Sequence, residues 1–237
     1  MDKSCNSSLI RQEPIIVPKI YDSCRAKDCV TLVACATKPT NMEETHVNKG
    51  EPIPVPVGAV SVVVHDMTVK AVKVVSEKPS VFKKGIWDLE LDYIFEYSLD
   101  FKNCNNRTIQ STDAFSAFNK TVSLYGGDGE NSAVFTNLFP SFVSPITQGG
   151  APFVVVEAKA ISLKSELKST RHNPSPIEVL VTIGMFNEIQ LCRIAALNVD
   201  SRGAVIPKEC ERKDPLNPCE FFDKLDFPIN DFNPPNK

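Results

Sequence analysis

Cysteines are the residues of this chain with the most evident chemistry. The 237 residues include eight of them. Five stand in segments rich in proline or polar residues rather than in apolar strand patterns: Cys5, Cys24, Cys29, Cys210 and Cys219. No pair has the CxxC spacing of a zinc site and the three histidines are scattered, so zinc is the least favoured use. Thiols that stay reduced and disulfides between subunits both remain open.

The segment Trp87–Phe101, WDLELDYIFEYSLDF, carries a dense group of carboxylates. Every odd position is large and apolar, whereas the even positions hold five acids and no base. This period of two predicts a β-strand with one buried and one solvated face. Asp88, Glu90 and Asp92 would lie about 6–7 Å apart on the solvated face, but Ca²⁺ usually takes loop carboxylates and carbonyls as well. Pairing with lysines of the segment 70–84 on a neighbouring strand is therefore favoured.

No recognised catalytic constellation occurs in the chain. There is no GxSxG or HExxH pattern, and His46, His65 and His172 stand apart in a polar loop, a strand or turn, and a second loop. The glycine-rich run 126–129 lacks the pattern of a phosphate-binding loop. We therefore predict no catalytic, cofactor-binding or metal-binding residues, no cofactor, and a protein that is not an enzyme.

Charge and hydropathy narrow the range of partners. A formal net charge of -3 gives no basis for general binding to nucleic acid or to anionic membranes. No run of about 18 apolar residues occurs, and residues 1–14 lack the apolar core of a signal peptide. We expect no nucleic-acid partner, no membrane partner, and synthesis without a signal peptide.

Apolar alternation recurs along the chain and predicts further strands. Residues 59–76 suit one long strand or a hairpin that turns near His65 and Asp66. Residues 152–168 fit a strand with a bulge or a helical end near Ile161, and residues 177–199 alternate with a turn as an option at Asn187 and Glu188. With 18 prolines against ten glycines, the pattern predicts an all-β protein, most simply a jelly-roll-like β-sandwich with extended N- and C-terminal arms.

The expected organisation is an N-terminal arm over residues 1–28, a β-sandwich over 29–202 and a C-terminal arm over 203–237. The C-terminal arm is rich in proline and contains four phenylalanines that we predict to be its anchors: Phe221, Phe222, Phe227 and Phe232. This arm can wrap its own sandwich, which is favoured, or dock on a neighbouring subunit.

Three blocks together carry a family resemblance: VPKIYDSCRAKDC (17–29), KKGIWDLELDYIFEY (83–97) and SRGAVIPKECERKDPLNPCEFFDKLDFP (201–228). They resemble a family of spore-surface proteins from spore-forming clostridia. The resemblance spans nearly the whole chain. It implies a non-enzymatic component of the coat, exosporium or an appendage, made in the mother-cell cytoplasm and assembled with itself and with other spore-surface proteins. Lysis of the mother cell would then expose the cysteines to an oxidising exterior.

We therefore expect a self-assembling structural protein whose copies join by exchange of arms or addition of edge strands. Intersubunit disulfides are expected at the five cysteines named first, whereas Cys104 and Cys192 are expected to be local or buried. Two alternatives from other classes are a carbohydrate- or surface-binding β-sandwich, which needs an exposed aromatic platform, and an enzyme with an unfamiliar site.

Overall fold

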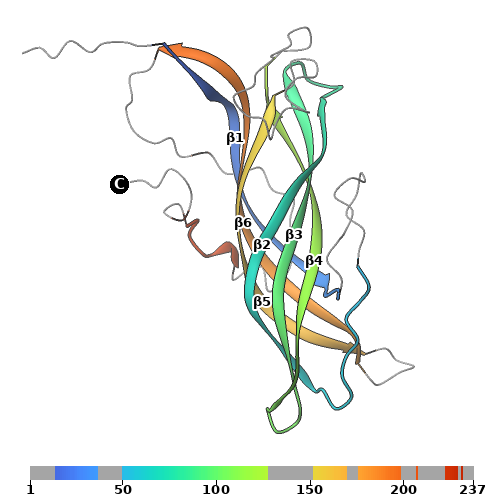
Figure 1. Ribbon diagram of the computed structural model, residues 1–237. Helices are drawn as coiled ribbons and strands as arrows, with labels where there is room; N and C mark the ends of the chain where they lie inside the picture. Colours follow the sequence, from blue (N-terminus) through green and yellow to red (C-terminus); the bar gives the residue numbers. More distant parts are fainter. Residues whose placement is uncertain are drawn as a thin grey trace, which may run out of the picture.

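The computed structural model describes residues 14–36, 50–127, 152–169, 176–198 and 222–228, with the single positions 207 and 231. These residues form six long strands (Figure 1). The strands are β1 (Pro14–Val33), β2 (Ser61–Pro79), β3 (Ile86–Lys102), β4 (Thr108–Tyr125), β5 (Phe153–Ser169) and β6 (Pro176–Asn198). Among the described residues, no helix has the length and apolar character that a membrane crossing requires.

The strands make two antiparallel sheets of three strands each. Sheet A has the order β1-β6-β5 and sheet B the order β2-β3-β4. At one border of the two sheets, the Ser165 hydroxyl of β5 donates a 2.7 Å hydrogen bond to the Val62 carbonyl of β2. At the other border, Cys35, just past β1, pairs with Phe115 of β4. The expected all-β sandwich is confirmed, with six described strands against the eight of a full jelly roll.

Strand β3 forms the floor of the core, as its alternation predicts. Its even-numbered acids face away from sheet A, and its odd-numbered side chains face the interior and are all at most 6% exposed: Trp87, Leu89, Leu91, Tyr93, Phe95, Tyr97, Leu99 and Phe101. Burial of one such side chain stabilises the fold by about 1.5–3 kcal/mol. This single strand therefore supplies a large share of the apolar surface that holds the two sheets together.

Strand β6 is the matching centre of sheet A. Its odd-numbered residues from Val179 to Leu191 face the core. The turn that the sequence offers at Asn187 and Glu188 is wrong, because both residues lie within an unbroken strand and pair on both sides, Asn187 with Ala26 of β1 and with Ala158 of β5. A central strand satisfies its backbone groups on both edges and so tolerates two polar residues.

Two ambiguous segments of the sequence are single bulged strands. In β2 the register shifts between His65 and Thr68, where Asp66 adopts a positive φ of 55°. The backbone absorbs the extra residue there and continues instead of turning back as a hairpin. In β5 the register shifts between Ser162 and Lys164, so the strand-with-bulge option is confirmed and the helical end is wrong.

Strand β1 takes in part of the segment that is expected to form the N-terminal arm. Strand β1 begins at Pro14 and pairs with β6 from there to Val33, so residues 14–28 belong to sheet A. Pro14 and Pro18 suit either an edge strand or a linker, and they lie on an edge strand, where a missing N–H can be tolerated. Residues 1–13 and most of 203–237 lie outside the described residues.

Sheet A narrows to two strands at one end. Pairing of β5 with β6 starts at Phe153 opposite Cys192, so in the described chain residues 193–198 of β6 pair with β1 alone. We call this two-stranded ribbon, residues 14–19 and 193–198, the β1–β6 projection. Figure 1 shows it extending away from the rest of the strands at the top of the molecule.

Candidate assembly surfaces

A C-terminal segment, residues 222–228, lies on the outer face of sheet A (Figure 1, red, beside β6). Phe222 is fully buried and packs against Phe186 of β6 with 4.4 Å between ring centroids, and Phe227 meets Phe186 edge-on at 5.7 Å. The floor beneath Phe222 is Gly184, where a Cβ atom would come within 2.7 Å of the ring. A glycine at this position of β6 therefore leaves the space that the phenylalanine fills.

Polar contacts from β1 fix the path of the same segment. The Lys27 ammonium donates a 2.9 Å hydrogen bond to the Asp223 carbonyl and another to the Leu225 carbonyl. The Arg25 guanidinium lies 5.0 Å from the centre of the Phe227 ring, a cation–π distance. We call the surface formed by Arg25, Lys27, Gly184 and Phe186 the arm site. The arm site therefore binds the backbone of the segment, through Lys27, as well as its aromatic side chains.

The predicted anchors divide into described and undescribed residues. Phe222 and Phe227 pack on the arm site of their own chain. Phe221 and Phe232 lie outside the described residues. An ion pair between Lys159 and Asp231 adds a contact beyond the aromatic pair. Both of its side chains are about half exposed, so it contributes little.

The cysteines of the described chain differ in redox state. Cys24 faces the core and Cys29 faces the arm site, and each is disulfide-bonded. They cannot be bonded to each other, because five strand positions separate them by about 16 Å and place them on opposite faces. Cys35, Cys104 and Cys192 are reduced, so the partners are not among these three. Cys192 is buried and Cys104 exposed.

Three of the five cysteines that are predicted to join subunits are not described by the structure. Cys5, Cys210 and Cys219 lie outside the described residues. In this single chain Cys24 and Cys29 are already oxidised. These two cysteines can join subunits only if the segments that carry their disulfide partners are exchanged between copies. Their role in joining subunits therefore stays a prediction.

The acids of β3 are held by the two neighbouring strands. Lys70 of β2 makes a 2.6 Å ion pair with Glu96, which confirms the lysine pairing at that position. The Asn119 amide of β4 donates hydrogen bonds of 2.9 Å to Glu90 and 2.7 Å to Asp92. Within the described ranges, no group of three or more His, Cys, Asp or Glu side chains is placed to hold a metal ion. These carboxylates thus take part in hydrogen bonds and ion pairs between the strands of sheet B.

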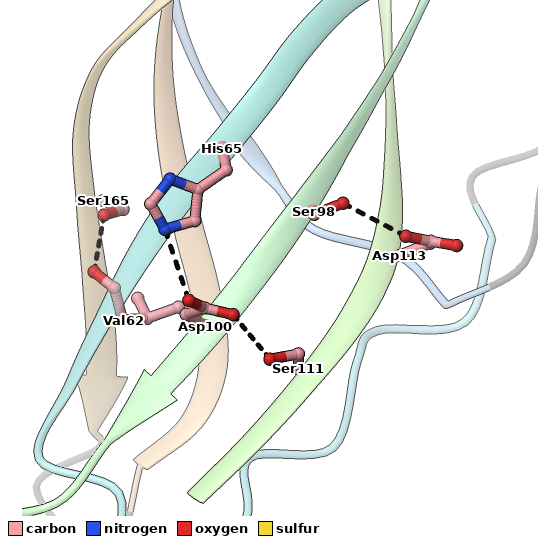
Figure 2. A network of polar contacts seen from close by, with 7 residues as sticks. All are labelled: Val62, His65, Ser98, Asp100, Ser111, Asp113 and Ser165. Carbon is pink, nitrogen blue, oxygen red and sulfur yellow. Dashed lines mark hydrogen bonds and ion pairs between the residues drawn. The ribbon is translucent and has the colours of Figure 1, made fainter. Parts of the chain in front are cut away.

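One cluster on sheet B brings together the residue types of a catalytic triad (Figure 2). His65 Nε2 lies 3.3 Å from Asp100 Oδ2, and the Ser111 hydroxyl donates a 2.6 Å hydrogen bond to Asp100 Oδ1. Ser98 donates to Asp113 beside it. A triad needs histidine between serine and aspartate, so that the imidazole can take the hydroxyl proton. Here the aspartate is central, and the arrangement satisfies its charge without activating Ser111.

A second polar cluster, inside the core, has no counterpart in the sequence predictions. Lys120 of β4 lies opposite Leu91 on the inward face of sheet B, and its ammonium contacts both carboxylate oxygens of Asp28 of β1 at 2.7 Å. The Asn187 amide of β6 donates a 2.7 Å hydrogen bond to Asp28 Oδ2. Only the three-dimensional pairing of β1, β4 and β6 brings these residues together. We call them, with Tyr93, the inter-sheet cluster.

The fold and its outer surface define the class as an all-β sandwich that carries a C-terminal segment in a formed site on one sheet. The family described as Exosporium protein A matches residues 19–194, more than half of the chain, and the chain belongs to this family. The resemblance of the three sequence blocks to a spore-surface family is thereby confirmed, and the family's name places it in the exosporium. No curated protein and no solved structure matches the chain.

Proposed function

We propose that this protein is a self-assembling structural component of the exosporium, whose copies join by exchange of their C-terminal segments and by addition at exposed strand edges, with disulfides fixing the result. The observation that supports it most is the arm site. There a segment distant in sequence from β1 and β6 occupies sheet A through a buried aromatic anchor and hydrogen bonds to its backbone.

Contacts of this kind do not depend on which copy supplies the segment. The arm site of one subunit would bind the segment of a neighbour with the same Phe222 packing and the same Lys27 hydrogen bonds, which is the logic of domain swapping. An extended chain spans about 3.3 Å per residue, so the stretch between Asn198 and Phe222 is long enough to reach an adjacent copy. Exchange therefore converts an intrachain contact into an intersubunit one without new chemistry.

The β1–β6 projection supplies a second joining surface, and the occupant we propose is another copy of this chain. Ile16 is 65% exposed and Ile20 48% exposed along β1. In the described chain, residues 14–19 of β1 pair on one side only, with β6. A strand edge with exposed apolar side chains is a template for pairing with a further strand. The ribbon extends past the point where β5 stops pairing with β6 (Figure 1).

Oxidation would make the assembly permanent. Cys29 packs within the arm-site cluster beside Phe186 and Phe222 and is disulfide-bonded. If the bonded segments are exchanged between copies, the same bond links two subunits. The proposal retains Cys5, Cys24, Cys29, Cys210 and Cys219 as the candidate intersubunit cysteines, with the neighbours being copies of this chain and other spore-surface proteins.

A mixing experiment tests exchange directly. The variant Gly184→Ala blocks the arm site and keeps an intact segment, whereas Phe222→Ala keeps the arm site and loses the anchor. Each variant alone is expected to stay mainly monomeric in light scattering after chromatography, when handled in reductant. A mixture is expected to form a species of twice the mass after the two chains are unfolded and refolded together, because the intact segment of one can occupy the intact arm site of the other.

A matched control is Phe82→Ala, since Phe82 is an exposed phenylalanine outside the arm site. This variant is expected to assemble as the unaltered chain does. Exchange is ruled out if the mixture remains monomeric while the unaltered chain assembles. Self-assembly itself is ruled out if the unaltered chain is monomeric at every concentration, with and without reductant.

A further inference from the structure

The inter-sheet cluster places an amine and a primary amide against one carboxylate in the interior of the sandwich. The Lys120 ammonium and the Asn187 amide nitrogen each lie 2.7 Å from the same oxygen of Asp28, Oδ2. The Lys120 side chain is 13% exposed and that of Asp28 19% exposed. Asn187 is fully buried. The nucleophile and the amide are thereby held next to each other by a single acid-base group.

Two further atoms of the cluster are buried without hydrogen-bond partners among the described residues. They are the Tyr93 hydroxyl and the Asn187 side-chain oxygen Oδ1, and both residues have 0% exposure. A buried amide oxygen without a donor is unusual in a folded protein. Burial first, and the nearby Asp28 charge second, raise the pKa of Tyr93 above its ordinary range, so its hydroxyl remains a hydrogen-bond donor.

We propose that Lys120 and Asn187 form an intramolecular isopeptide bond, with Asp28 as the group that moves the protons. This bond would covalently join β4 of sheet B to β6 of sheet A across the core. It is independent of assembly, because all the participating residues belong to one chain.

The reaction needs no oxidant, metal or cofactor. One proton passes from the Lys120 ammonium to the Asp28 carboxylate along their 2.7 Å contact, which leaves a neutral amine and a neutral acid in place of a largely buried charge pair. The amine lone pair attacks Cγ of Asn187, and the electron pair of the C=O bond moves to Oδ1. We assign the stabilisation of this negative charge to the Tyr93 hydroxyl, a buried donor of the cluster that has no partner in the described chain and is not hydrogen-bonded to Oδ1 before the reaction.

The second half of the reaction releases ammonia. Asp28 delivers its proton to the Asn187 amide nitrogen, to which it is already hydrogen-bonded, and then takes a proton from the added nitrogen. The extra proton of the original ammonium thus ends on Asp28, or leaves with the ammonia as ammonium. The Cγ–Nδ2 bond breaks as the C=O bond reforms. One N–C bond is made and one is broken, so a primary amide and an amine become a secondary amide and ammonia, with no change in oxidation state.

The placement of the acids favours Asn187 over Asp28 as the acyl partner. A bond from Lys120 to Asp28 would consume the carboxylate and would need a second acid to move protons. Two other acids of the described chain are at most 7% exposed, and both face away from the core: Asp92 is hydrogen-bonded to Asn119 on sheet B, and Glu188 to Gln190 on sheet A. The partly buried Glu77 lies on β2, which β3 separates from the strand of Lys120. Asp28 therefore acts on both nitrogens and is not consumed.

Mass spectrometry of the intact, fully reduced and unfolded chain tests the bond without reference to any variant. The expected mass is that of the sequence less one ammonia, with the peptides that contain Lys120 and Asn187 recovered as one branched species after digestion. A chain of full mass overturns the proposal. So does the loss of one water with Lys120 joined to Asp28.

Three variants assign the roles. Lys120→Arg keeps the positive charge beside Asp28 and cannot form the bond, so it is expected to fold, judged by near-ultraviolet circular dichroism, and to keep its full mass. Asp28→Asn keeps both reacting groups and is expected to lose most of the cross-link. If Asp28→Asn cross-links as completely as the unaltered chain, Asp28 does not move the protons. The control Asn119→Ala removes an asparagine of the outer face and is expected to keep the cross-link.

Discussion

Gly184 and Phe222 fit so closely that one added carbon would force them apart. A Cβ atom on Gly184 would lie 2.7 Å from the Phe222 ring and 3.1 Å from Leu163, and real Cβ contacts are longer than the first of these. The contact joins the middle of sheet A to a residue 38 positions later in the chain. It therefore limits where the C-terminal segment can lie.

The substitution Gly184→Ala is therefore expected to release residues 222–228 from sheet A while leaving the core intact, because Gly184 lies on the outer face of β6. Hydrogen exchange of the segment should rise by at least tenfold, and exchange within β3 should not change. Ser162→Ala, on an exposed position of the neighbouring strand β5, serves as the control. Unchanged protection of the segment in Gly184→Ala would mean that Phe222 does not need this floor.

The polar half of the arm site is tested by Lys27→Met, which keeps most of the side-chain volume and removes the donors to the Asp223 and Leu225 carbonyls. A hydrogen bond from a charged donor is worth about 1.5–3 kcal/mol, so the protection of the segment should fall by a comparable free energy. Lys70→Met, which breaks a surface ion pair, is the matched control. Equal protection of residues 222–228 in both variants would show that the aromatic contacts alone hold the segment.

Truncation of a core side chain of β3 is expected to lower the free energy of unfolding more than truncation of a surface side chain. Leu91→Ala removes a fully buried side chain and should lower the free energy of unfolding by about 2–5 kcal/mol, since truncation leaves a cavity between the sheets. Val81→Ala, at a position 92% exposed, should change it by less than about 0.5 kcal/mol. Denaturant titration measures both values. Similar values for the two variants would contradict the packing of β3 described above.

Much of this core could be predicted from the sequence, because alternation over fifteen residues leaves one register for β3 that turns all eight large odd-numbered side chains to the core. The start of β1 and the unbroken length of β6 could not be predicted in this way. Pro14 and Pro18 suit an edge strand as well as a linker, and Asn187 suggests a turn until it is known to be paired on both sides. Local sequence carries neither fact, since both depend on which strands become neighbours.

The inter-sheet cluster could not be predicted for a related reason. Lys120 follows Asn119 in a strand of mixed polarity and resembles a solvated lysine. Its partner Asp28 is distant in sequence, and the two meet because β1 and β4 border each other where the sheets adjoin. Conversely, the aromatic anchors of the C-terminal arm were predictable in kind, because phenylalanines in a proline-rich segment need an apolar surface to cover them.

Glu77 is expected to lower the stability of the fold as the pH rises towards neutrality. Burial raises the pKa of this carboxyl from 4.5 to about 7, against an opposing effect of Arg193. The folded chain therefore binds the Glu77 proton more tightly than the unfolded chain, and folding loses stability between about pH 4.5 and pH 7 as the proton dissociates. The cost above pH 7 is at most about 3 kcal/mol for a pKa change of this size.

The variant Glu77→Gln is expected to be more stable than the unaltered chain at pH 8, with the difference shrinking towards pH 4. Thermal unfolding across this range measures the difference. Glu166→Gln, at an ion pair whose two side chains are both about half exposed, is the control and should show a small difference at every pH. A constant difference for Glu77→Gln from pH 4 to pH 8 would contradict the assignment.

Thiol reactivity should separate the reduced cysteines by position. Burial raises the pKa of Cys192 to about 11, so little thiolate is present at neutral pH and a thiol reagent should not modify it in the folded chain. Cys104 is exposed and should react within minutes. Peptide mapping after labelling identifies both sites, and unfolding without reductant should expose Cys192. Rapid labelling of Cys192 in the folded chain would contradict its burial.

Electron microscopy of the purified full-length chain, concentrated and then oxidised, tests the central claim most directly. Subunits that exchange segments and pair at their edges should build ordered sheets or filaments, which Phe222→Ala should not form. Well-dispersed single particles of the unaltered chain, at high concentration and with its cysteines oxidised, would contradict the proposal that this protein assembles with itself.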